Sequence, residues 1–184
     1  MRYAWTYNAT KGGDTDRPKR CSPLGSICKS HRLVIRSSYG AELLAAAHGM
    51  EDVYPTIITL IEIAKGVRTA DQIKRYREHG NLELDVTLTL DAEGVYNLLV
   101  NRDLAAPAEK TLLGHVAWIR ELLRNRATKR MQWCDTRDMV ADGHTRGSID
   151  RTALLQAMNG EQAYKYETRR HEPATITFTE SHAC

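Results

Sequence analysis

Hydrophobic residues recur at helical spacing in the first half of the chain. Between residues 39 and 64, leucine, alanine, methionine and isoleucine keep a period near 3.6, which predicts one long amphipathic helix. Ser37 and Ser38 precede it and can cap its N-terminus, because a hydroxyl oxygen accepts a hydrogen bond from a free backbone N–H. Pro55 lies inside this range, so we expect a kink there or a break into two helices.

The same reading predicts further elements along the chain. Residues 84–90, LDVTLTL, alternate between apolar and polar side chains and include β-branched residues, which is typical of a strand. Further helices are expected at 66–80, 92–100, 108–126 and 148–158, and further strands at 25–28, 33–36, 129–134 and 175–178. This mixture of strands and helices favours an α/β fold, with a mixed sheet flanked by helices.

The chain has 184 residues, of which 42% are hydrophobic, enough for one domain with a proper core. Residues 1–24 are rich in glycine, proline and charge and are predicted to form an irregular segment. The folded domain is expected over residues 25–159, followed by a loosely ordered C-terminal tail at 160–184.

No apolar run approaches the ~20 residues that a membrane helix needs, so no membrane partner is expected. The N-terminus also lacks the apolar segment of a signal peptide. The four cysteines are scattered, without the close pairs of a metal site. We therefore expect free thiols in a reducing compartment and an intracellular location, in the cytoplasm or the nucleus.

The net charge of +3 is unevenly distributed. Residues 1–37 carry eight Lys/Arg against two Asp, residues 38–100 carry ten Asp/Glu against five Lys/Arg, and residues 120–137 are again basic. Basic flanks around an acidic middle are compatible with a polyanion-binding surface beside a carboxylate cluster, and equally with solvated helix faces. The candidates for contacts with phosphates are Arg120, Arg124, Arg126 and Arg130.

Three carboxylates stand at the ends of predicted elements. Glu42 lies near the start of the long helix, Asp91 directly follows the strand at 84–90, and Asp142 precedes the last helix. Each has a structural interpretation, as a favourable charge at a helix N-terminus or as an N-cap. Together, acidic side chains at one sheet edge can hold two Mg²⁺ ions, which stabilise the attacking water and the leaving oxygen in phosphodiester cleavage.

Several stretches resemble, in order, a known family. They are RSSYGAELLAAA (36–47), LTLDAEGVYNLL (88–99), HVAWIRELLRN (115–125) and MQWCDTRDMVADGHTRG (131–147). They resemble the ribonuclease H domain at the end of copia-type retrotransposon polyproteins, which also contain the reverse transcriptase. That family has Ala-Glu after a serine-rich strand end, a strand ending in Asp, a helix with Ile-Arg-Glu, and a T-x-x-M-x-A-D motif. The resemblance covers roughly residues 25–150.

The resemblance implies an endonuclease that hydrolyses the RNA strand of an RNA–DNA hybrid with Mg²⁺ or Mn²⁺ in a two-metal site. Glu42, Asp91 and Asp142 fall on three of the family's four metal-binding carboxylates. The fourth belongs to the first strand of the ribonuclease H-like fold, and we predict that this strand is missing and the fold truncated at its N-terminus. The chain is then either an active enzyme or an inactive remnant. The alternative is a non-catalytic α/β remnant that binds nucleic acid or a protein partner.

Overall fold

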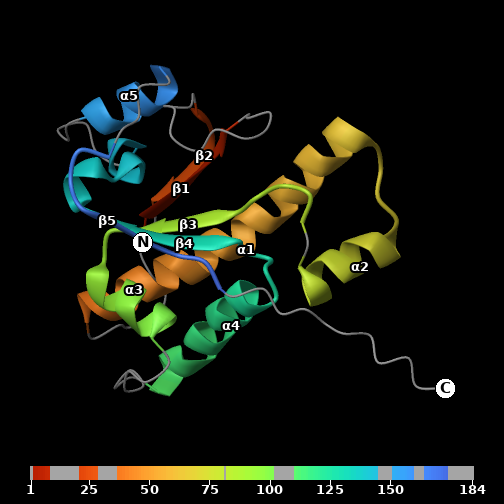
Figure 1. Cartoon of the computed structure of the whole chain (residues 1–184), viewed down its shortest axis with the longest axis horizontal. Coiled ribbons are helices and arrows are strands. Elements are labelled where there is room, and N and C mark those ends of the chain that lie inside the picture. Colours follow the sequence, from red (N-terminus) through yellow and green to blue (C-terminus); the bar gives the residue numbers. More distant parts are fainter. Residues whose placement is uncertain are drawn as a thin grey trace.

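The structure, a computed structural model, describes residues 2–8, 21–28, 37–80, 82–101, 110–144, 151–159 and 164–173. The elements, with 3₁₀ helices marked η, are β1 (Arg2–Asn8), β2 (Cys21–Cys28), α1 (Ser38–Lys65), α2 (Ala70–His79), β3 (Thr87–Leu90), α3 (Glu93–Val100), η1 (Lys110–Leu112), α4 (Leu113–Arg124), β4 (Arg130–Cys134), η2 (Thr136–Asp138), η3 (Val140–His144), α5 (Thr152–Asn159) and β5 (Thr168–His171) (Figure 1). The predicted α/β class is confirmed at this level.

The described strands form two small sheets. β1 and β2 pair in antiparallel fashion, and β3, β4 and β5 form a second sheet in that order. β3 and β4 are parallel, with Leu90 opposite Trp133, whereas β4 and β5 are antiparallel, with Trp133 opposite Arg169. Because β3 and β4 are parallel, their carboxyl ends meet at one edge of the sheet, and Asp91 follows β3 at this edge.

Helix α1 confirms the long helix predicted from the apolar period. Ser37 is its N-cap, and its side-chain oxygen accepts a hydrogen bond from the backbone N–H of Gly40 at 3.1 Å. The helix continues through Pro55 to Lys65, so the alternative of two separate helices is wrong. Proline removes one backbone hydrogen bond, but the buried isoleucines that follow it keep this part of the helix packed against the rest of the chain.

Helix α2 corresponds to the predicted helix at 66–80. Thr69 and Gln72 form a reciprocal capping box at its start. It ends at Gly80, which has a φ of 65° and packs against the backbone of the turn after α4. A Cβ atom added at Gly80 would lie 1.8 Å from the carbonyl oxygen of Asn125, so only glycine fits this contact.

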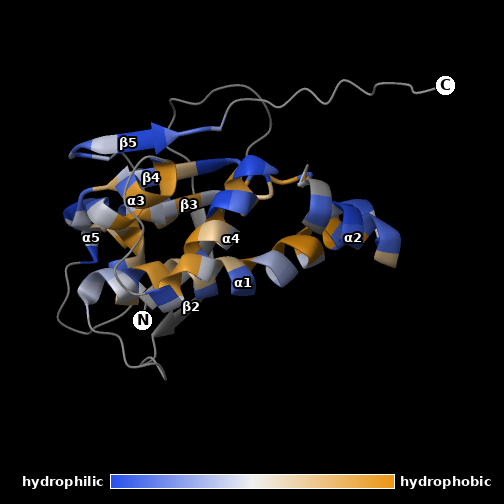
Figure 2. Ribbon diagram, turned by 90° about the horizontal axis from the view of Figure 1, so that it is seen from below, coloured by the Kyte–Doolittle hydropathy of each residue, from blue (hydrophilic) through white to orange (hydrophobic). Residues whose placement is uncertain are grey.

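Two adjoining clusters of buried side chains join the helices to the β3–β4–β5 sheet. The first gathers apolar residues of α1, α3, α4 and the sheet, including Leu43, Val95, Ile119 and Met131. Figure 2 shows these hydrophobic segments facing one another between the helices and the strands. The second cluster extends the core along α1 towards α2 and contains Met50, Ile57, Ile61 and Val86. None of the helices in the described part is long and apolar enough to span a membrane.

The expected irregular segment at residues 1–24 is wrong in part, because it contains β1 and half of β2. The sequence RYAWTYN includes aromatic and β-branched residues, which fit a pleated strand, and CSPLGSIC supplies its antiparallel partner. The predicted strand at 25–28 is confirmed as the end of β2, whereas the one expected at 33–36 lies outside the described residues. β1 contacts α1 and η3. The N-terminal region therefore forms part of the fold.

The expected loose tail at 160–184 also contains an ordered strand, β5, beside β4. An ion pair of 2.7 Å between Arg130 and Glu172 joins β4 to the residue after β5. The backbone N–H of Tyr166, just before β5, donates to the carboxylate of Asp138 at 2.9 Å. Long-range contacts of this kind have no local signature, so the sequence pattern missed β5. The strand predicted at 175–178 lies outside the described residues.

Candidate functional site

Asp91 stands between the carboxyl end of β3 and the start of α3. The N-cap residue of α3 is Ala92, which rules out the simple interpretation of Asp91 as a helix cap. The side chain of Asp91 is half-buried. Its backbone carbonyl accepts a hydrogen bond of 2.9 Å from the indole N–H of Trp133 on β4. The residue is thus tied to the neighbouring strand at the edge where both strands end.

Asp142 lies in η3, after the end of β4. It is half-buried, and its backbone N–H donates to the carbonyl of Met139 at 3.2 Å. Helix α5 begins only at Thr152, so Asp142 is not the N-cap of that helix. η3 contacts α5 on one side and β1 on the other. Capping of α5 therefore does not explain the position of Asp142.

The pKa of the thiol of Cys134, the last residue of β4, depends on the charges around this edge of the sheet. Cys134 is fully buried. Burial raises the pKa of its thiol, and the negative charges of Asp91, Asp138, Asp135 and Asp142 raise it further, to about 12. Such charge effects decline with distance, so all four carboxylates belong to the neighbourhood of Cys134. Asp91 and Asp142 therefore lie in the same region, one at the end of β3 and the other in η3 beyond the end of β4.

Glu42 is placed differently from these two aspartates. It lies in the second turn of α1, where its side chain is exposed while Leu43 and Leu44 beside it are buried. Its charge is not among those that shift the pKa of the Cys134 thiol. α1 itself contacts both β1 and β3, so the helix passes close to the sheet. The structure thus places Glu42 on the solvent-facing side of an adjacent helix.

Two acids at this edge, Asp135 and Asp138, were not among the predicted site residues. Asp135 is the N-cap of η2 and binds the guanidinium of Arg137, which lowers the pKa of its carboxyl to about 2. Asp138 is buried and accepts the backbone N–H of Tyr166. Both carboxylates thus stabilise the backbone near η2 by accepting hydrogen bonds from N–H groups. The partner of Asp138 is 28 positions away, so spacing alone could not reveal its role.

The donor chemistry of this edge can be compared with the needs of a divalent cation. Among the described residues, no group of three or more His, Cys, Asp or Glu side chains is arranged to hold a metal ion. Mg²⁺, however, commonly takes only one or two protein carboxylates and completes its octahedron with water and substrate phosphates. The carboxylates of Asp91 and Asp142 are oxygen donors of the type that Mg²⁺ accepts.

Arg120, a predicted phosphate contact, is engaged with the end of α3. Its Nη2 donates to the carbonyls of Leu98 at 2.6 Å and Asn101 at 3.0 Å. The last carbonyls of a helix have no partner within the helix, and a guanidinium can satisfy them. Arg120 is half-buried in α4 and joins that helix to α3. Its described contacts are structural.

The other three predicted arginines also have partners within the chain. Arg124 pairs with Glu121, Arg126 donates to the carbonyl of Pro173 at 3.3 Å, and Arg130 pairs with Glu172 at 2.7 Å. Arg124 is the most exposed of the four, and its pair with Glu121 lies on the surface of α4. Surface pairs of this kind exchange partners at little cost, so Arg124 can still reach an external anion.

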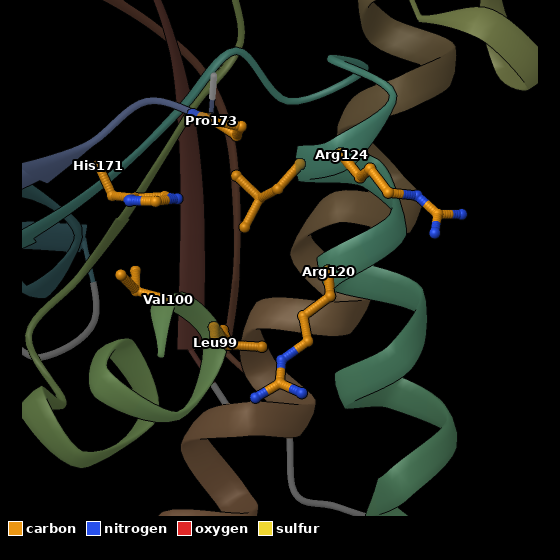
Figure 3. A pocket seen from close by; sticks show the side chains of 7 residues that line it. Leu99, Val100, Arg120, Arg124, His171 and Pro173 are labelled. Carbon is orange, nitrogen blue, oxygen red and sulfur yellow. The ribbon is translucent and has the colours of Figure 1, made fainter. Parts of the chain in front are cut away.

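A small pocket lies between α3, α4 and the end of β5 (Figure 3). Its volume is about 60 Å³, and its lining is mostly apolar, with the imidazole of His171 directed into it and Arg124 directed away. His171 is opposite Met131, near the amino end of β4, whereas the carboxylates gather at the carboxyl end beyond Cys134. The pocket is therefore separate from the acidic edge and has room for only a few atoms.

No protein-family model, curated protein or solved structure matches this chain. The geometry of the acidic edge and the order of the elements that form it are therefore the basis for a functional conclusion.

Proposed function

We propose that this chain is a ribonuclease H-like nuclease domain, similar to that of copia-type retrotransposon polyproteins. It hydrolyses the RNA strand of RNA–DNA hybrids and depends on Mg²⁺ or Mn²⁺. The proposal rests on one observation above all: Asp91 follows β3 at the edge where the parallel strands β3 and β4 both end, and its carbonyl is hydrogen-bonded to Trp133 of β4. Asp142, in η3 after β4, is among the carboxylates that raise the pKa of the Cys134 thiol at the end of β4, and α/β folds commonly bind ligands at this edge of a sheet.

The order of the elements supports the same proposal. Helix α1 with Glu42, strand β3 followed by Asp91, helix α4 with its Ile-Arg-Glu sequence, strand β4, and η3 with Asp142 succeed one another as in the resembling family. β1 contacts both α1 and η3, although it pairs with β2 in a sheet separate from β3 and β4. The sequence of β1, RYAWTYN, contains no Asp or Glu, so this strand supplies no fourth carboxylate.

The chemistry assigned to these residues is limited to what their positions allow. Asp91 and Asp142 would bind the divalent cation, whereas Glu42 is exposed on α1 and is not placed beside them. The cation supplies stabilisation of charge on the phosphodiester and activation of water. Arg124, exposed on α4, is the described arginine best able to contact a phosphate.

A non-catalytic module that binds nucleic acid or a protein partner is the second candidate. Two observations favour it: β1 has no acidic residue, and Glu42 is not among the charges that act on Cys134. Such a module would still bind a polyanion or a protein surface. It would show no metal-dependent turnover.

An assay with three labelled duplexes separates the two candidates. The full chain is incubated with an RNA–DNA hybrid, an RNA duplex and a DNA duplex of one sequence, with Mg²⁺ or with a chelator, and binding is measured on the same samples. We expect cleavage of the RNA strand of the hybrid alone, lost with the chelator and in the double variant Asp91→Asn/Asp142→Asn. Binding of the hybrid without cleavage by the wild-type chain would favour the non-catalytic module.

A further inference from the structure

The backbone at Asp91 is fixed from the neighbouring strand. The ladder between β3 and β4 pairs Leu90 with Trp133 and then stops. The indole N–H of Trp133 reaches one residue further and donates to the carbonyl of Asp91 at 2.9 Å. This hydrogen bond therefore replaces the missing ladder contact at the residue proposed to bind the cation.

Arg169 of β5 holds that indole in place. It is opposite Trp133 in the antiparallel pairing of β4 and β5, and its guanidinium carbon lies 4.9 Å from the centre of the Trp133 ring. Its Nη1 also pairs at 2.5 Å with Glu93, the first residue of α3. Arg169 thus extends from β5 across Trp133 to the residue two positions after Asp91. The segment from Asp91 to Glu93 is thus held at its first residue by Trp133 and at its last residue by Arg169.

We propose that Trp133 and Arg169 are positioning residues for Asp91, and that strand β5 is therefore part of the candidate site. This inference rests on the proposed function, because it assigns Asp91 to cation binding. Neither side chain touches the cation. Outer residues of this kind restrict the carboxylate before the cation arrives, which raises affinity because less freedom is lost on binding.

The chain offers two variants and a matched control. Trp133→Phe keeps an aromatic ring beneath Arg169 and removes the N–H donor. Arg169→Met keeps an apolar stem and removes the charge. Lys129→Met is the control, because Lys129 forms a comparable surface ion pair of 2.6 Å with Asp85, before the amino end of β3.

Two measurements on the full chain test the proposal without relying on catalytic activity. The first is the dissociation constant for Mn²⁺ by calorimetry, and the second is amide hydrogen exchange of the peptide around Asp91. We expect both variants to weaken Mn²⁺ binding by about tenfold and to speed exchange at residues 91–93. Lys129→Met should change neither, although its melting temperature should fall about as much as that of Arg169→Met.

The outcomes separate this proposal from the function on which it rests. Unchanged Mn²⁺ affinity in both variants, with wild-type binding intact, would overturn the positioning role alone. Unchanged exchange at residues 91–93 would overturn it as well. A wild-type chain that bound no Mn²⁺, with or without an uncleaved hybrid analogue, would overturn the proposed function and this inference together.

Discussion

At the scale of single residues, partners within the chain decide which charged groups can serve a ligand. Asp135 and Asp138 belong to the same acidic edge as Asp91 and Asp142. Arg137 binds Asp135, and Asp138 accepts a hydrogen bond from the backbone N–H of Tyr166. Asp91 was singled out from sequence because it follows a strand, and Asp142 because it precedes the last predicted helix. The hydrogen bond to Asp138 was not predictable, because its partner, Tyr166, lies 28 positions away, just before β5, a strand with no local signal in the sequence.

Arg120 gives a prediction at this scale. Arg120→Met should lower the free energy of unfolding by about 2 kcal/mol, because two helix-end carbonyls lose a charged donor in a half-buried place. Urea denaturation measures this change. Arg124→Met is the control on the same helix, and it should cost less than about 0.5 kcal/mol, since it removes only a surface pair. Equal stability of the two variants would argue against the structural role of Arg120.

At the scale of elements, local pattern and local capping explain what could be predicted. The N-cap of each of two helices binds a residue three positions later, Ser37 with Gly40 in α1 and Thr69 with Gln72 in α2. α1 matches its expected range closely, and α2 lies within its expected range. β1 and β5 depend on pairing with distant segments. Their sequences, RYAWTYN and TRRH, lie in charged surroundings, and neither was predicted to form a strand.

Gly80 offers a test of how elements meet. Gly80→Ala should lower the free energy of unfolding by at least about 2 kcal/mol, because the new Cβ would overlap the carbonyl of Asn125 and the residue has a positive φ. Gly66→Ala is the matched control: its φ is 91°, but its Cβ would meet nothing within 4 Å, so about 1 kcal/mol is expected. A Gly80→Ala cost no greater than that of Gly66→Ala, in thermal or urea unfolding, would contradict the close contact.

At the scale of the whole molecule, the parallel pair β3 and β4 links the hydrophobic core to the candidate site. Its apolar face packs against α1, α3 and α4, and its carboxyl edge gathers acidic residues around Cys134. The family resemblance singled out Asp91 and Asp142 in this region. It did not anticipate that β1 exists without an acid, that Glu42 is exposed, or that β5 is ordered, because these depend on tertiary packing.

The most direct test of a cation site at Asp91 is the cleavage rate of a labelled RNA–DNA hybrid in Mg²⁺, compared between Asp91→Asn and Asp85→Asn. Both variants remove one carboxylate charge next to β3, but Asp85 is exposed before the amino end of the strand and pairs only with Lys129 in the described contacts. We expect Asp91→Asn to lose at least about 100-fold in rate, whereas Asp85→Asn stays within about twofold of the wild type. Equal rates in the two variants would contradict a cation site at Asp91.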